Sequence, residues 1–184
     1  MILMDYRLIE GCRVGDYAAI ERFVQTYQQD IYRSALSILD DSSEAEDATQ
    51  EILLAALRAL ESFHGASSLK TWLYSITVNL CRTRLQQRKR RERLAEILGG
   101  ILRLRNARPP LVEEEVIQHE SDETFWHAIR SLKEKHRIPI VLRYYQNLSV
   151  AEIAVILQIP EGTVHSRLNT ARRQLHDALK EGNS

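Results

Sequence analysis

Residues 149–179, SVAEIAVILQIPEGTVHSRLNTARRQLHDAL, decide the fold of this chain because they predict two short helices joined by a tight turn. Ser149 and Glu152 have the spacing of a capping box, in which each side chain accepts the other residue's backbone N–H, so a helix is expected to begin there. Pro160 ends that helix because its ring cannot continue one, and Glu161 places a carboxylate in the first turn of the next. The pattern predicts a helix-turn-helix.

The second of these helices has one apolar and one polar face. At about 100° per residue its apolar residues form a narrow stripe that is expected to be buried: Val164, Leu168, Ala171, Leu175 and Leu179. Ser166, Asn169 and Arg173 lie opposite, flanked by His165, Thr170 and Arg172. Small hydrogen-bonding side chains reach base edges in a major groove, and arginines bind phosphates or guanine. The alternative reading is an amphipathic helix with a solvated basic face.

The length of the chain allows one large or two small domains, and the internal pattern described below fits two small ones. The chain has 184 residues and a net charge of zero, but its acids cluster at 40–51 and 113–123 and its bases at 82–108.

Cys12 and Cys81 match no zinc spacing and are expected to be reduced, inert thiols. No apolar run approaches the roughly 20 residues that span a bilayer, and no signal peptide begins the chain. These features predict a cytoplasmic protein without membrane insertion.

Three further helices are expected before residue 93. Apolar residues three and four apart, from Ile20 to Leu39, predict the first helix. Ser43 and Glu46 form another capping box, whose helix would end before Gly65. Ser67 or Ser68 is expected to cap the third. Its core-facing residues would be Leu69, Leu73, Ile76 and Leu80. These helices predict a bundle as the first domain.

The third helix carries a second nucleic-acid signal. Trp72, Tyr74 and Asn79 precede a run of basic residues, namely Arg82, Arg84, Arg88, Lys89, Arg90, Arg91 and Arg93. Aromatic faces stack on unpaired bases and cationic side chains follow phosphates, so this stretch favours single-strand binding. The alternative is that Trp72 packs on the first helix and the basic run is a solvated helix end.

We expect an all-α fold with two helical domains joined by a flexible linker: residues 1–93, a linker at 94–121, and residues 122–184. Gly99-Gly100 and Pro109-Pro110 break any long periodicity within the linker. Helices beginning near Phe125 and Ile138 are expected to cover the inner faces of the helix-turn-helix. Whether the domains close on each other is open, and attraction between the acidic and basic stretches would favour closure, in a salt-dependent way.

Two motifs resemble the extracytoplasmic-function sigma factors of bacterial RNA polymerase. Residues 44–51 (EAEDATQE), 63–76 (FHGASSLKTWLYSI) and Asn79 resemble region 2 of that family, and residues 148–154 (LSVAEIA) and 160–168 (PEGTVHSRL) resemble region 4. The resemblance covers nearly the whole chain apart from the linker. Two long motifs in the family's order are far more specific than a lone helix-turn-helix.

The resemblance implies three binding surfaces. Asp47, Gln50 and Glu51 correspond to the surface that docks on core RNA polymerase. The minus-ten element, melted and held as a single strand, would be bound by Ser67, Ser68, Lys70, Thr71, Trp72, Asn79 and Arg82. The duplex minus-thirty-five element would be read by His165, Ser166, Arg167, Asn169, Arg172 and Arg173. No cofactor and no metal are implied, no sensor domain is expected after Ser184, and a separate anti-sigma protein is the family's usual regulator.

Two other classes of function fit the sequence less well. A stand-alone transcriptional regulator would use only the helix-turn-helix, usually as a dimer, and would leave the acidic face and the Trp72–Arg93 stretch without a role. An enzyme is the weakest reading, because the six histidines form no ligand pair at helical spacing and no phosphate-binding glycine loop is present.

Overall fold

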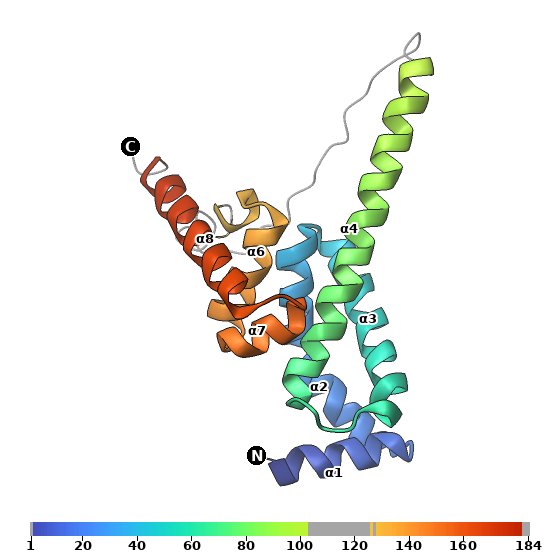
Figure 1. Ribbon diagram of the computed structural model, residues 1–184. Helices are drawn as coiled ribbons and strands as arrows, with labels where there is room; N and C mark the ends of the chain where they lie inside the picture. The colour runs from blue at the N-terminus through green and yellow to red at the C-terminus, as the bar shows by residue number, and fades with distance from the viewer. Residues whose placement is uncertain (1, 103–125, 127, 182–184) are drawn as a thin grey trace.

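The computed structural model describes residues 2–102, 126 and 128–181, and all regular structure in these ranges is helical (Figure 1). The elements of the first domain are α1 (Ile2–Arg13), α2 (Tyr17–Leu39), α3 (Ser42–Ala59), the short 3-10 turn η1 (Leu60–Ser62) and α4 (Leu69–Leu102). Those of the second are α6 (Glu134–Ile140), the π-helical turn η2 (Val141–Tyr145), α7 (Val150–Leu157) and α8 (Glu161–Glu181). The expected all-α fold is confirmed.

α2 is the central helix of the first domain. The Asp16 carboxylate caps its start by accepting the Ala18 N–H at 3.1 Å, and Asp40 ends it in a left-handed conformation with φ 60°. Much of the expected apolar stripe is fully buried, with Phe23, Ile31 and Leu39 each at 0% exposure. The periodicity therefore gave the correct inward face.

α3 begins with a different cap from the one expected. The carboxylate of Asp41, not the Ser43 hydroxyl, accepts the N–H of Glu44 at 2.7 Å. Asp41 has the extended backbone that a capping residue needs, whereas Ser43 already lies inside the first turn. The predicted Ser43–Glu46 capping box is therefore wrong, because an equally good capping side chain stands two residues earlier.

α4 is longer than the sequence indicates. The Ser68 hydroxyl accepts the N–H of Thr71 at 3.0 Å, which confirms the serine cap. The helix then continues to Leu102, through Gly99 and Gly100, although the linker was expected from residue 94. A glycine costs only about 1 kcal/mol in a helix interior, and extending an existing helix is far easier than nucleating one. The remainder of the expected linker, 103–121, lies outside the described residues.

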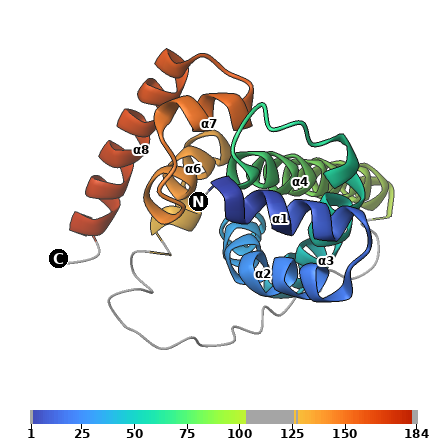
Figure 2. The same ribbon diagram turned by 90° about the horizontal axis from the view of Figure 1, so that it is seen from below.

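α1 was not expected, and it packs where α2 begins. Gly11 allows this close approach, because a Cβ atom added there would lie 2.5 Å from the Cβ of Ala19. Arg13 then ties the end of α1 to η1, since its guanidinium donates to the backbone oxygens of Leu60 at 3.0 Å and Phe63 at 2.6 Å. The first domain is thus four helices with α1 across one end (Figure 2).

The second domain lies against the α2 and α4 side of the first domain, away from α3 (Figures 1 and 2). α7 packs along the start of α4, and α6 packs on α2. The second domain's own core includes Leu142, Leu148, Ile153 and Val164, each at most 2% exposed. Both cysteines are buried free thiols, and burial raises the pKa of Cys81 to about 12, so that thiol stays protonated at neutral pH.

Candidate nucleic-acid interface

The helix-turn-helix has the cap and the turn that the sequence predicts. The Ser149 N–H donates to Glu152 Oε2 at 2.8 Å, and the Glu152 N–H donates to the Ser149 hydroxyl at 3.2 Å. The first of these bonds is the main reason that the pKa of Glu152 lies below its usual value. Gln158 ends α7 in a left-handed conformation with φ 54°. The second helix, α8, starts at Glu161 after Pro160.

α8 presents its polar residues to solvent. Val164, Leu168, Ala171 and Leu175 are buried, whereas the predicted base-reading and phosphate-binding residues are exposed or, for Arg167, half-buried: His165, Ser166, Arg167, Asn169, Arg172 and Arg173. The helix therefore separates core residues from candidate DNA-binding residues as expected, and leaves the candidate DNA-binding face uncovered.

Arg172 is held by a residue that the sequence did not single out. Its Nε donates to the Tyr144 hydroxyl at 2.6 Å, and its Nη1 donates to Asn169 Oδ1 at 3.0 Å. The guanidinium carbon also lies 5.6 Å from the centre of the Tyr144 ring. These contacts fix the direction of the guanidinium and leave Nη2 for another acceptor. Tyr144 comes from η2, so only the fold brings it to α8.

The start of α4 holds the second candidate surface. Trp72 is half-buried and its ring lies 5.1 Å from that of Phe63, at 51°. Ser68, Lys70 and Asn79 are exposed, and Ser67 and Arg82 are half-buried. The indole is thus supported from one side while remaining partly accessible, which is the arrangement of a stacking platform.

Two residues of this surface form hydrogen bonds with the second domain. Thr71 is only 2% exposed, and its hydroxyl donates to Glu152 Oε1 at 3.0 Å. Lys70 Nζ donates to the backbone oxygen of Gln146 at 2.8 Å. In this arrangement Thr71 does not face solvent, although the resemblance implies that it contacts DNA.

The candidate polymerase-docking residues Asp47, Gln50 and Glu51 are all exposed on α3. Beside them runs a groove of about 1020 Å³ between α3 and α4, which Asp47 and Glu51 line from one wall and Asn79 from the other. The groove therefore brings a candidate DNA residue next to the candidate docking residues, a proximity that the sequence did not indicate.

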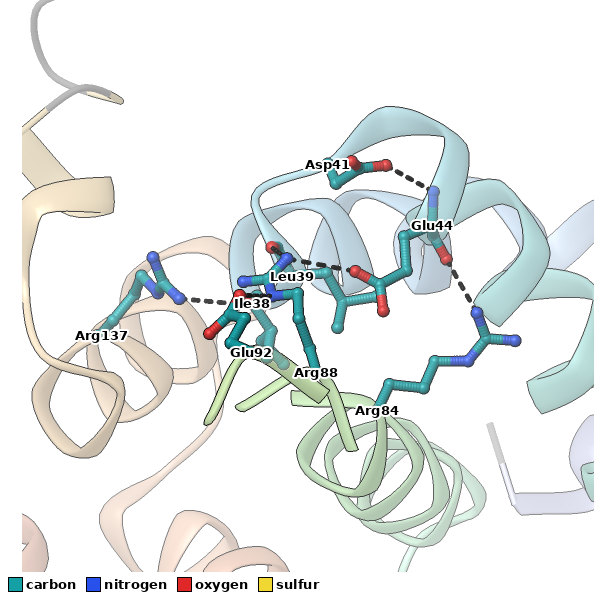
Figure 3. A network of polar contacts seen from close by, with 8 residues as sticks. All are labelled: Ile38, Leu39, Asp41, Glu44, Arg84, Arg88, Glu92 and Arg137. Atoms are coloured by element: carbon teal, nitrogen blue, oxygen red, sulfur yellow. Dashed lines mark hydrogen bonds and ion pairs between the residues drawn. The ribbon is translucent and has the colours of Figure 1, made fainter. Parts of the chain in front are cut away.

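Two arginines of α4 form ion pairs with α3 inside the first domain. Arg84 Nη2 pairs with Glu51 at 2.6 Å, and Arg88 Nη1 pairs with Glu44 at 3.2 Å. Figure 3 shows Arg88 also reaching the backbone oxygen of Leu39, at 3.1 Å, and Asp41 capping Glu44. Both arginines face α3 because they are four residues apart. The expected basic stripe is therefore reduced by these two members.

Neither a metal site nor a membrane span is found in the parts of the chain that the structure describes. Within those ranges no three histidine, cysteine, aspartate or glutamate side chains are grouped to bind an ion. None of the described helices combines the length and the apolar character that crossing a bilayer requires.

Comparison with known proteins matches both domains to one family. The family model for sigma-70 region 2 matches residues 23–91, and that for sigma-70 region 4 matches residues 122–175. The RNA polymerase sigma-H factor of Pseudomonas aeruginosa is 34% identical over 183 residues, covering 96% of this chain and 94% of its own. The ECF RNA polymerase sigma factor SigW of Bacillus subtilis is 34% identical over 186 residues, covering 98% and 100%.

Solved structures share the fold. The sigma factor RpoE of Bartonella quintana, in complex with the anti-sigma factor NepR, has a TM-score of 0.68 at 24% identity over 87% of this chain and 96% of its own. CnrH, in complex with the cytosolic domain of CnrY, has a TM-score of 0.66 at 22% identity over 96% and 97%. With both domain models matched in order and relatives aligned over almost its full length, the chain belongs to the extracytoplasmic-function sigma factors of bacterial RNA polymerase.

Proposed function

We propose that the chain's three surfaces divide the work of a promoter-specificity subunit. The exposed acids of α3 dock on core RNA polymerase, the start of α4 holds the unpaired minus-ten strand, and α8 reads the minus-thirty-five duplex. The observation that carries this proposal is that the exposed polar face of α8 and the Trp72 platform are separate, differently built candidate surfaces for nucleic acid on one chain. A stand-alone regulator needs only the first.

The two surfaces suit two different states of DNA. α8 offers small polar side chains and arginines on one face of a helix, which is what a major groove accepts. Trp72 offers an aromatic face, and stacking a flipped base on it would return part of the few kcal/mol spent in unstacking that base. Opening therefore needs no nucleotide hydrolysis by this chain. We assign it a non-catalytic role in the cytoplasm.

The decisive experiment is transcription in vitro from fragmented genomic DNA of the source organism, with core RNA polymerase and with or without this protein. Sequencing of transcript starts should reveal new starts that share two upstream elements. If no new starts appear and the chain also fails to bind core, the stand-alone regulator becomes the better reading. Tight binding to duplex without polymerase would favour that regulator independently.

Asp47→Lys should weaken binding to core RNA polymerase several-fold without changing thermal stability. Asp47 is exposed, and in the described part of the chain no ion pair engages it, so the reversed charge acts on the partner rather than on the fold. A titration of labelled core measures the effect. Glu21→Lys, an equal charge change on the exposed face of α2, should leave the affinity unchanged. Equal affinities for Asp47→Lys and the parent would remove Asp47 from the docking surface.

Arg172→Ala should lower the promoter affinity of the holoenzyme and flatten its dependence on salt. If the free Nη2 binds a phosphate, the slope of log affinity against log salt should fall by about 0.9 per lost contact. Lys135→Ala is the matched control, because it removes one positive charge from an exposed position on α6 of the same domain. A slope that stays at the parent's value would show that Arg172 touches no phosphate.

A separate anti-sigma protein is proposed as the regulator. The similar sigma factor RpoE was determined in complex with the anti-sigma factor NepR. Copurification of the tagged chain from its own host, before and after stress, would reveal a bound partner.

A further inference from the structure

Gln146 belongs to the second domain, but its side chain lies in the first. It follows η2 and is only 3% exposed. Its Nε2 donates to the Ser34 hydroxyl at 2.9 Å and more weakly to the Asp30 backbone oxygen at 3.4 Å, both on α2. Its Oε1 accepts the hydroxyl of Tyr74 on α4. Both ends of this buried amide are therefore satisfied by the other domain, which is the condition under which burying an amide is tolerated.

The same contact covers the turn that is proposed to bind the minus-ten strand. The backbone oxygen of Gln146 accepts from Lys70 Nζ at 2.8 Å, and Glu152 accepts from the Thr71 hydroxyl at 3.0 Å. Lys70, Thr71 and Tyr74 occupy the first two turns of α4, so Gln146 and Glu152 close over its start. A DNA strand that binds Lys70 or Thr71 has to displace these partners.

A second anchor lies further along α2, at its C-terminal end. Arg137 of α6 donates from Nη2 to the Ile38 backbone oxygen at 2.7 Å, as Figure 3 shows. Backbone oxygens at a helix end lack helical partners and carry partial negative charge, so a buried guanidinium suits this place. Arg130 adds an ion pair to Asp40 at 3.7 Å. The Nε of Arg137, however, has no hydrogen-bond partner, and this lowers the stability of the closed form.

We infer that Gln146 and Arg137 form an interdomain latch that holds the free chain closed and blocks the minus-ten surface until the domains separate on polymerase. The functional half of this inference rests on the function proposed above. The latch differs from the salt-dependent attraction of acidic and basic stretches that the sequence indicated. Ion pairs between the domains are present, because Glu134 of α6 lies 3.7 Å from Arg82 and 3.1 Å from Lys89 of α4. These ion pairs lie at the surface, whereas the hydrogen bonds of the Gln146 amide are buried and neutral.

Small-angle scattering of the full chain without polymerase tests closure. The parent should keep one compact radius of gyration from low salt to 1 M salt, because buried contacts are weakly screened. Gln146→Ala should enlarge that radius. Ser34→Ala should enlarge it as well, because it removes the hydroxyl on α2 that accepts from Gln146 Nε2.

Gln174→Ala is the matched control, because this exposed amide bonds to His136 inside the second domain. A parent that is already expanded, or that expands only in high salt, overturns the latch. Equal radii for Gln146→Ala and the parent overturn it as well, as does a comparable expansion of Gln174→Ala.

The consequence for activity is measured as the concentration of protein that gives half-maximal transcription with fixed core polymerase. Removing the latch should lower that concentration about three- to ten-fold for Gln146→Ala, because less of the free chain is closed, while maximal transcription stays at the parent's level. Unchanged half-maximal concentration in an expanded variant would show that closure is not inhibitory. Absence of transcription with every variant, parent included, would count against the proposed function and leave the scattering result standing.

Discussion

Trp72→Ala is expected to reduce promoter opening by the holoenzyme about ten- to a hundred-fold. Stacking of one base on an aromatic side chain is worth about 1–3 kcal/mol, and each 1.4 kcal/mol is a factor of ten. Trp72 rests against Phe63 and remains partly accessible, so part of the indole is available for a base to stack on. Permanganate reactivity of unpaired thymines near the transcript start measures the opening.

Two comparisons separate stacking from damage to the fold. Trp72→Phe keeps an aromatic face and should recover most of the opening, whereas Trp72→Leu, which restores apolar packing alone, should not. Binding of the holoenzyme to the upstream duplex should be the same in all three variants, since α8 makes that contact. Opening that is equal in Trp72→Ala and the parent would mean that the indole serves only to pack against Phe63.

Phe23→Ala should destabilise the first domain by about 3–5 kcal/mol, the usual cost of removing a buried phenylalanine. Its side chain is fully buried at 0% exposure in α2 and contacts Tyr27, with ring centres 5.1 Å apart. Because a domain's whole stability is about 5–15 kcal/mol, this substitution removes a large part of it. Urea unfolding followed by circular dichroism measures the loss.

Tyr17→Ala is the control for Phe23→Ala. It deletes an aromatic side chain from the same helix at a position that is 80% exposed, so a change within about 0.5 kcal/mol is expected. A loss below about 1 kcal/mol for Phe23→Ala would mean that the core around α2 is much looser than the contacts indicate.

Local features of the fold could be predicted from the sequence because they depend on neighbouring residues. The Ser149–Glu152 capping box, the Ser68 cap and the buried stripe of α8 all follow from spacing within a few residues. The start of α3 shows the limit of such reasoning. Asp41 and Ser43 are both good capping residues, and only the backbone conformation selects Asp41.

Contacts between distant residues could not be predicted. Gln146 stands in a short loop segment without periodicity, and its partners Ser34 and Tyr74 lie 112 and 72 residues away. The use of Arg84 and Arg88 is equally hidden, because a basic run on a helix looks the same whether it faces nucleic acid or an adjacent acidic helix. The exposure of the candidate recognition residues of α8 followed from the helical period, whereas the hydrogen bond between Arg172 and Tyr144 could not be predicted, because Tyr144 lies 28 residues away.

The length of α4 has a mechanical consequence. With 34 residues and about 1.5 Å of rise per residue, it is a rod of about 50 Å. The Trp72 platform lies at one end of this rod, and the polypeptide leaves the first domain at the other. The covalent tether to the second domain is thus anchored far from the surface that this domain covers. Swinging the second domain aside requires no unwinding near Trp72, so Lys70 and Thr71 can be uncovered while the geometry of the platform stays intact.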